Sequence, residues 1–260
     1  KKGVLKAAKK SSRDAAEGLI VAGEDKESLV LIEINTETDF VAKNSEFLNF
    51  CSKLSTLSTK ANNIDELNNI IIDGVSIKDS IVNLVSKIGE NIKLRRFKKI
   101  IKKNSKLVYY IHNKASNIAG KIVSALKYSS NKAAGDKFAA NICMHIAAMS
   151  PMALDEKNLD KDFVKKEKSI IEEQIDKSGK KSEIIEKIIN GKLTKVISEN
   201  TLLNQKWVLD QELTVFKAIE SFNKDNSDKF EVLDFCKFKV GEGIEIKKVD
   251  FSEEVKSLTK

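Results

Sequence analysis

The sequence predicts an α+β protein with two subdomains, each a small antiparallel sheet packed against helices, and with a protruding antiparallel helical hairpin (a coiled coil). Short apolar runs of strand length occur in pairs, longer segments repeat apolar residues at helical spacing, and two consecutive helical segments carry only a narrow apolar seam. We expect residues 1–104 to form the N-terminal subdomain and residues 105–158 with 201–260 the C-terminal subdomain. Residues 159–200 are expected to be an inserted hairpin.

The first unit is expected to read strand, turn, strand, helix. Its strands are predicted at residues 18–22 and 29–34, and residues 92–97 could complete their sheet. A helix is expected after Asn44, because Asn is a good N-cap residue and apolar residues then recur at helical spacing. Those residues are Phe47, Phe50, Cys51, Leu54 and Leu57. A further helix, ended by Gly89, has an apolar face made of Ile77, Ile81, Leu84, Val85 and Ile88.

The second unit repeats this order. Strands are predicted at residues 107–111 and 121–126, followed by a helix over residues 136–149. Pro151, the only proline, is expected to end that helix, because its ring disfavours helical geometry in the residue before it. A strand at residues 235–240 is expected to complete the second sheet.

The predicted hairpin consists of two helices joined by a tight glycine-containing turn at residues 178–181. Helices that are apolar along one narrow seam only should pair with each other and leave their charged faces to solvent. The first seam contains Phe163, Val164, Ile170, Ile171 and Ile175. The second contains Ile184, Ile185, Ile188, Ile189, Leu193, Val196 and Ile197.

The net charge of +8 and pI of about 9.1 raise a nucleic-acid hypothesis, because lysine and arginine release counterions from phosphates. Only Arg13, Arg95 and Arg96 are arginines, so the bidentate contacts of base recognition are scarce. Most lysines alternate with acids and are typical of solvated helix faces. We therefore expect no specific nucleic-acid partner, and weak nonspecific RNA affinity stays open.

The sequence contains none of the patterns expected of an enzyme or a metalloprotein. Cys51, Cys143 and Cys236 lie far apart and are expected to be reduced structural thiols, and His112 and His145 have no ligand spacing. His145, which lies among apolar residues, is expected to be a hydrogen-bonded core residue. No P-loop, Rossmann glycine pattern or nucleophile motif occurs. We predict no cofactor, no metal site and no covalent chemistry, and no run approaches a membrane span.

The segment Thr-Asp-Phe-Val-Ala-Lys-Asn at residues 38–44 puts a carboxylate beside a large aromatic ring at a predicted strand-to-helix junction. Two ordinary interpretations stay open on pattern alone. Phe40 stands seven residues before Phe47 and could be the first member of the same buried stripe. Asp39 could be a first-turn acid that faces the helix dipole. The alternative is that an exposed pair forms a wedge on a turn held by rigid neighbours.

Residues 38–44 resemble the Thr-Asp-Phe-Val-Ala-Lys/Arg-Asn signature of the translation elongation factor Ts family. Further landmarks occur in the family's order along nearly the whole chain. They are Lys6 to Lys10, Ile88-Gly89-Glu90-Asn91-Ile92 with Arg95-Arg96, Tyr110-Ile111-His112, Met144 to Ala148, Asn190 to Leu193, and Val240 to Glu245 with Asp250-Phe251.

The resemblance implies a guanine-nucleotide exchange factor of translation elongation that binds elongation factor Tu in its GDP form. In the family, the Asp-Phe pair intrudes near the Mg²⁺ and phosphate region of elongation factor Tu and loosens GDP. It therefore implies an exchange wedge made of Thr38, Asp39, Phe40, Val41 and Asn44.

The resemblance also implies that His112 lies near the GTPase contact, although Asn113 stands where a glycine is common, which leaves the local turn open. Val208 and Leu209 match an apolar segment that contacts the nucleotide-binding domain, whereas Trp207 is expected to pack in the core. The sequence does not fix the oligomeric state, and we expect a 1:1 complex with elongation factor Tu and a possible dimer of such heterodimers.

The runner-up hypothesis is a lysine-rich RNA-binding accessory protein of translation. The expected location is the cytoplasm, or a mitochondrion or plastid if a transit segment precedes Lys1. The chain begins at Lys1 rather than Met, and the family usually carries a small helical N-terminal domain that also grips elongation factor Tu. We therefore expect this sequence to be part of a longer protein, and to bind elongation factor Tu more weakly without that domain.

Overall fold

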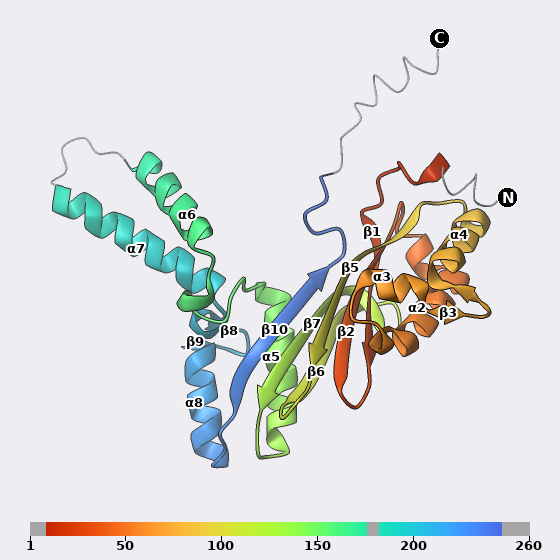
Figure 1. The fold of residues 1–260 in the computed structure, drawn as a ribbon. Coiled ribbons are helices and arrows are strands. Elements are labelled where there is room, and N and C mark those ends of the chain that lie inside the picture. Colours follow the sequence, from red (N-terminus) through yellow and green to blue (C-terminus); the bar gives the residue numbers. More distant parts are fainter. Residues whose placement is uncertain (1–8, 176–181, 246–260) are drawn as a thin grey trace, which may run out of the picture. The chain divides into compact units, whose positions relative to one another are not determined.

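The computed structural model describes residues 9–175 and 182–245, and it confirms the α+β prediction (Figure 1). The described residues divide into two compact units. Unit 1 contains residues 9–101, 113–123 and 238–245, and unit 2 contains residues 102–112, 124–175 and 182–237. Residues 159–200 belong to unit 2, and their standing as a separate insertion stays a prediction.

Unit 1 is built on antiparallel strands. Their bounds are β1 Glu17–Glu24, β2 Ser28–Thr36, β5 Ile92–Ile101 and the start of β7 Ala119–Ser129. β2 lies between β1 and β5, and β1 pairs on its other edge with the start of β7 through Val21 and Ala119. The predicted strands of the first unit are thus confirmed, including the one at residues 92–97.

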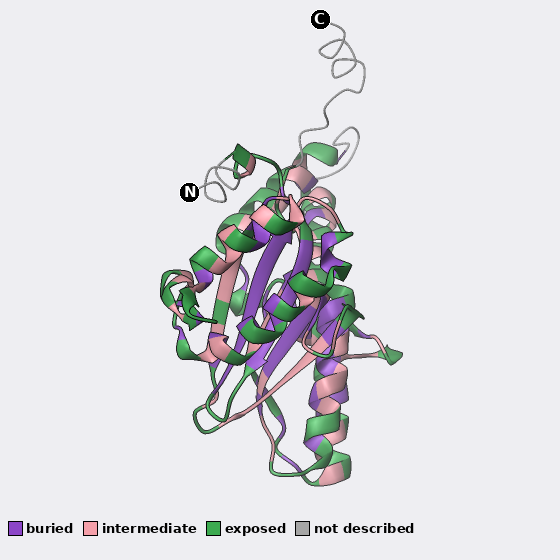
Figure 2. Cartoon of the chain, turned by 90° about the vertical axis from the view of Figure 1, so that its right-hand side faces the viewer, coloured by how far each residue is buried: buried purple, intermediate pink, exposed green. Residues whose placement is uncertain are grey.

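Helices cover the apolar face of this sheet. They are α2 Ser45–Leu57, α3 Ile64–Asn69 and α4 Ile77–Ile88, with a short hairpin of β3 Ile71–Ile72 and β4 Val75–Ser76 between α3 and α4. Alternate residues of β1 and β2 pack against the apolar faces of α2 and α4 to form one core. Figure 2 shows buried residues along the strands and exposed residues on the outer helix faces. As predicted, Asn44 caps α2, and Gly89 ends α4 with a φ of 89°.

Unit 2 contains β6 Lys106–Lys114, β7 and β10 Glu231–Lys239, and both β6 and β10 pair with β7. Residues 113–114 of β6, 119–123 of β7 and 238–239 of β10 belong to unit 1. Helices α5 Ala134–Met149 and α8 Val215–Asn226 pack with these strands around a core rich in aromatic rings. A small hairpin joins β8 Lys206–Trp207 to β9 Asp210–Thr214. The predicted helix at residues 136–149 is confirmed, and Ser150, in the left-handed region at φ 51°, ends it before Pro151.

Helices α6 Lys161–Gln174 and α7 Ser182–Asn200 lie side by side in unit 2 (Figure 1). Ile171, Ile175 and Ile189 form the buried centre of their seam. Most other side chains on both helices are exposed, as expected for a pair that is apolar along one seam. Ile184 is exposed, so its assignment to the seam is wrong. The predicted turn at residues 178–181 lies outside the described residues.

A buried carboxylate ties the segment after β10 to the sheet of unit 1. Glu33 of β2 is fully buried and faces Arg96 of β5, whereas the next residue, Ile34, pairs with Leu94. Arg95 is therefore the extra residue of a β-bulge, which re-aims side chains. Because of the bulge, the guanidinium groups of both arginines reach Glu33, and Arg95 Nη1 donates to its two oxygens at 3.1 and 2.9 Å.

The same arginines hold the chain after β10. Arg96 Nη2 donates to the Lys239 carbonyl at 2.8 Å, and the Gly241 N–H donates to Glu33 Oε1 at 2.8 Å. Gly241 has a φ of 73°, and a Cβ there would lie 2.3 Å from the Ala16 carbonyl oxygen, so only glycine fits. Burial by itself raises the pKa of Glu33, but the donors from Gly241, Asn35 and Arg96 lower it on balance below its ordinary 4.5.

Candidate functional site

The turn at residues 38–44 connects β2 to α2 in unit 1. Its centre is the short 3-10 helix η1, Val41–Lys43, whose first two residues, Val41 and Ala42, are buried in the core of the unit. Because these two side chains anchor the turn from inside, Phe40 is left outside, with 77% of its surface exposed. The interpretation of Phe40 as the first member of the buried stripe is therefore wrong. An aromatic ring this exposed on an anchored turn is available to a partner.

A carboxylate from another segment fixes the start of this turn. Thr38 donates twice to Glu90, from its backbone N–H to Oε2 at 2.9 Å and from its hydroxyl to Oε1 at 2.6 Å. Thr36 also donates its hydroxyl to the Thr38 carbonyl at 2.8 Å. Glu90 directly follows Gly89, the residue that ends α4. The end of α4 therefore sets the position of the turn.

The neighbouring residue of the same segment makes a second connection. The backbone N–H of Asn91 donates to Glu37 at 2.6 Å, and the Asn91 side chain donates to the Arg13 carbonyl at 2.7 Å. Arg13 also pairs with Glu37 at 3.3 Å. Sequence reasoning missed Glu37, Glu90 and Asn91 as supports of the site. The available signal was the Ile-Gly-Glu-Asn-Ile landmark at residues 88–92, because the sequence pattern gave its polar residues no structural role.

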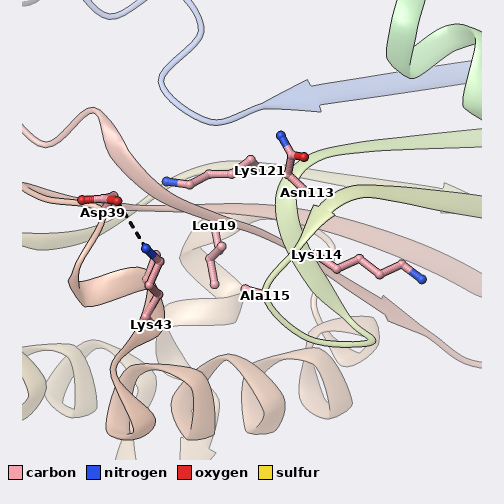
Figure 3. A pocket seen from close by; sticks show the side chains of 8 residues that line it. Leu19, Asp39, Lys43, Asn113, Lys114, Ala115 and Lys121 are labelled. Atoms are coloured by element: carbon pink, nitrogen blue, oxygen red, sulfur yellow. Dashed lines mark ion pairs between the residues drawn. The ribbon is translucent and has the colours of Figure 1, made fainter.

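Asp39 has a different environment from the one expected of an acid facing a helix dipole. Its carboxylate pairs with Lys43 of the same turn at 3.7 Å, and more than half of each side chain is exposed (Figure 3). Such an exposed pair contributes little to stability, about 0–1 kcal/mol. Asp39 and Lys43 also line a surface pocket of about 440 Å³ next to Phe40.

His112 is an exposed residue near the end of β6 in unit 2. Its Nδ1 lies 3.4 Å from the Tyr110 hydroxyl. The next residue, Asn113, has a φ of 52°. This left-handed backbone conformation lets the chain turn without the glycine that is common at this position in the family. Asparagine is among the residues that enter this left-handed region most easily.

Val208 and Leu209 form the tip of the β8–β9 hairpin, because the residues on either side of them, Trp207 and Asp210, are paired. Leu209 is 54% exposed, Val208 is partly buried, and Trp207 is buried in the core as expected. The Val208 N–H donates to Nδ1 of the buried His145 at 3.3 Å. Val208 and Leu209 therefore lie on a turn that a hydrogen bond to His145 attaches to the core of unit 2.

His145 is a hydrogen-bonded core residue, as predicted, and its two ring nitrogens have different partners. Nδ1 accepts from Val208, so Nε2 carries the proton and donates to Gln205 Oε1 at 2.9 Å. Gln205 in turn donates to the Glu199 carbonyl at 2.7 Å. The ring also stacks on Trp207 with 5.3 Å between centroids. Burial lowers the pKa of His145 below its ordinary 6.5, because removing the ring from water disfavours its charged form.

This environment makes stability depend on pH. A histidine that is held neutral in the fold contributes stability that is fully present above the unfolded pKa of 6.5 and is lost as the pH falls toward the folded pKa. We expect the free energy of unfolding to fall below pH 6.5 by up to about 1.4 kcal/mol per pH unit from this group. Urea unfolding between pH 7.5 and 5, compared with His145→Phe, measures this slope. An equal slope in both proteins would contradict the assignment.

The structure brings the five wedge residues together on one turn of unit 1. His112, Val208 and Leu209 belong to unit 2, so the eight predicted residues do not form a single cluster within one unit. Within residues 9–175 and 182–245, no group of histidine, cysteine and acidic side chains could hold a metal ion. No helix of the described part is both long and apolar enough to cross a bilayer. What these residues can do is present an exposed ring and carboxylate to another protein.

The sequence of the chain is similar to those of known proteins over most of its length. The family described as "Elongation factor TS" matches residues 37–242. The elongation factor Ts of Clostridium acetobutylicum is 39% identical over 262 residues, which cover 98% of this chain and 84% of that protein. Those of a Jannaschia species and of Rickettsia bellii are 37% and 34% identical, and each match covers the whole chain and 85% of the relative.

Proposed function

The chain belongs to the elongation factor Ts family, and from this premise we propose that it is a guanine-nucleotide exchange factor that binds elongation factor Tu·GDP and promotes release of GDP. Family membership supports a role in translation elongation. The single observation that carries the finer proposal is the exposure of Phe40 on an anchored turn, beside Asp39. The proposed partner is elongation factor Tu in a 1:1 complex, and the place of action is the cytoplasm.

Exchange requires binding energy rather than bond chemistry. A GTPase holds GDP through a backbone phosphate cradle and Mg²⁺, so a partner that distorts either element lowers nucleotide affinity. Burial of an aromatic ring in the partner contributes about 1.5–3 kcal/mol, which biases the equilibrium by about tenfold to hundredfold. Phe40 starts from an exposed position, so nearly all of this gain is available on binding.

Asp39 adds a charge beside the ring. Within the described part of the chain, its carboxylate is held by the exposed pair with Lys43 alone, so it can turn toward a partner at little cost. A carboxylate brought near a bound Mg²⁺ and phosphates competes for the metal and repels the phosphates. Thermodynamic linkage makes the effect mutual, because rebinding of nucleotide must weaken the complex by the same factor. The factor is thereby released after each exchange.

The test is the rate at which a fluorescent GDP derivative leaves elongation factor Tu, followed by stopped-flow fluorescence with and without this chain. We expect the release rate to rise with the concentration of the chain and to reach a plateau. Release that stays at its spontaneous rate, while the folded chain is present in excess, would contradict the proposed function.

The rival function, an RNA-binding accessory protein, finds less support in the structure. Arg95 and Arg96 are both engaged by Glu33, and Arg13 pairs with Glu37, so the described arginines are occupied within the protein. Filter binding to RNA over a salt series distinguishes the two functions. An RNA binder would show appreciable affinity that falls steeply with salt.

Removal of the Glu90 carboxylate should weaken exchange without unfolding the protein. In Glu90→Ala, both Thr38 donors lose their acceptor, so the turn that carries Phe40 loses its fixed position. We expect a plateau release rate about three- to tenfold lower, with faster hydrogen exchange of the Phe40 and Val41 amides.

Thr38→Val is the graded control for Glu90→Ala. It removes the bond from the hydroxyl and keeps the bond from the backbone N–H, so its effect should be smaller. Equal release rates in Glu90→Ala and the unsubstituted chain would show that this carboxylate does not position the turn.

A further inference from the structure

A basic pocket lies directly beside the proposed wedge and shares three residues, Asp39, Ala42 and Lys43, with its turn. The pocket has a volume of about 440 Å³. Its lining combines three lysines, one acid and one amide with apolar residues: Leu19, Asp39, Ala42, Lys43, Asn113, Lys114, Ala115 and Lys121. All of these residues belong to unit 1. They come from the 38–44 turn, β1, β6, β7 and the loop between β6 and β7 (Figure 3).

The charge of the pocket favours an anion. Three of its lining residues are lysines, and Asp39 is the one acid among them. Among residues 9–175 and 182–245, the one ion pair of Lys43 is the 3.7 Å pair with Asp39, and Lys121 pairs with Glu17 at 2.6 Å. Lys114 has no ion pair with any residue of the described part of the chain. The lysines therefore exceed the acids that neutralise them, and the buried floor made by Leu19 and Ala42 lowers the local polarity.

The weak ion pair between Lys43 and Asp39 can be replaced by a stronger pair between Lys43 and a carboxylate of the partner. The Lys43 side chain is 75% exposed and that of Asp39 is 51% exposed, so water screens their attraction. A carboxylate from a docked protein would meet Lys43 and Lys121 in a site from which that protein excludes water, where the same charges attract more strongly. Asp39 would then be free to turn with Phe40 toward the partner.

We propose that this pocket receives an acidic side chain of the protein that Phe40 contacts, and that it steers and anchors that protein. This inference rests on the proposed function, because it names the chemistry by which the same partner is recognised. An aspartate or glutamate on the partner is the occupant, with its carboxylate between the Lys43 and Lys121 ammonium groups and its apolar stem over Leu19. Long-range attraction of this kind acts mainly on the association rate.

The experiment compares two triple variants of the complete chain that carry the same net charge. The pocket variant is Lys43→Gln, Lys114→Gln and Lys121→Gln. The matched control is Lys26→Gln, Lys53→Gln and Lys60→Gln, three exposed lysines of unit 1 that do not line the pocket. Stopped-flow measurements give the association rate with elongation factor Tu·GDP over a salt series, and the plateau rate of GDP release. Urea unfolding checks that both variants fold.

We expect the pocket variant to associate about tenfold more slowly at low salt, with a weaker salt dependence than the unsubstituted chain. The control variant should associate within twofold of it. Equal association rates in the two variants would overturn the inference. A normal association rate with a lower plateau would also overturn it, because the pocket would then act on a phosphate of the leaving nucleotide.

This outcome is separable from the proposed function. If the unsubstituted chain does not accelerate GDP release, the proposed function fails whatever the lysines do. If the unsubstituted chain accelerates release and the two variants behave alike, only the pocket inference fails.

Discussion

Replacement of Phe40 by alanine should slow GDP release from elongation factor Tu by about tenfold to hundredfold and leave the fold intact. The ring is 77% exposed in the free protein, so its loss removes almost no packing, and the free energy of unfolding should change by less than about 0.5 kcal/mol. In the complex, the same ring would supply about 1.5–3 kcal/mol of apolar burial. The release rate is measured by stopped-flow fluorescence and the stability by urea unfolding.

Two other phenylalanines control this prediction. Phe216→Ala removes a ring of unit 2 that is 49% exposed, and it should leave the release rate unchanged. Phe47→Ala removes a fully buried ring seven residues after Phe40 and should cost about 3–5 kcal/mol of stability. A release rate in Phe40→Ala equal to that of the unsubstituted chain would remove Phe40 from the mechanism.

Glu33→Gln should be the most damaging of the charge-removing changes proposed, with a loss of about 3–5 kcal/mol in the free energy of unfolding. The glutamate is fully buried and bonded to both guanidinium groups and to the Gly241 N–H. A neutral amide leaves the two partly buried guanidinium groups without their buried counter-charge and turns an N–H₂ toward donors. Urea unfolding at neutral pH measures the loss.

The same carboxylate should contribute to sensitivity to acid. Its pKa is lowered in the fold, so its stabilising contribution is fully present above the ordinary value of 4.5 and is lost as the pH falls through the lower folded value. Glu33→Gln should abolish that part of the acid dependence. Glu242→Gln, which removes a partly exposed partner of Arg96 at 3.4 Å, is the control and should cost less than about 1 kcal/mol. A comparable loss in the free energy of unfolding for the two variants would contradict the proposed stabilising role of the Glu33 carboxylate.

Most regular elements could be predicted because their signals are local. The helix after Asn44 has both a capping residue and a complete apolar stripe, and α4 ends at a glycine in the left-handed region. Helix α8 was missed, although Val215, Ala218, Ile219 and Phe222 follow helical spacing and its N-cap Thr214 accepts from the Lys217 N–H. Its signal is weaker because lysine, glutamate and asparagine interrupt a short stripe.

The non-local features could not be read from the sequence. The bulge at Arg95 exists because Glu33, more than sixty positions earlier, draws in two consecutive arginines. The bonds from Thr38 to Glu90 likewise join residues whose separation of 52 positions carries no periodic signal. Family resemblance marked both segments as landmarks, but only their folding partners explain why those residue types stand there.

The candidate site illustrates both cases. Spacing alone favoured a buried Phe40, since it lies one heptad before Phe47. The structure gives the physical reason for the opposite outcome: η1 is a separate 3-10 turn, and Val41 and Ala42 occupy the inward positions that a continuous helix would have given to Phe40. Resemblance to a known signature, rather than periodicity, predicted the exposed ring.

The most direct measurement is photo-crosslinking from position 40. Phe40 is replaced by p-benzoylphenylalanine, which the exposed turn should accept, and the protein is irradiated with elongation factor Tu. Insertion of the side chain predicts a crosslink to the GTPase domain in the nucleotide-free complex, and its disappearance when excess GDP and Mg²⁺ are added. A stable complex in which position 40 gives no crosslink to elongation factor Tu would contradict the claim that this ring enters the partner and loosens its nucleotide.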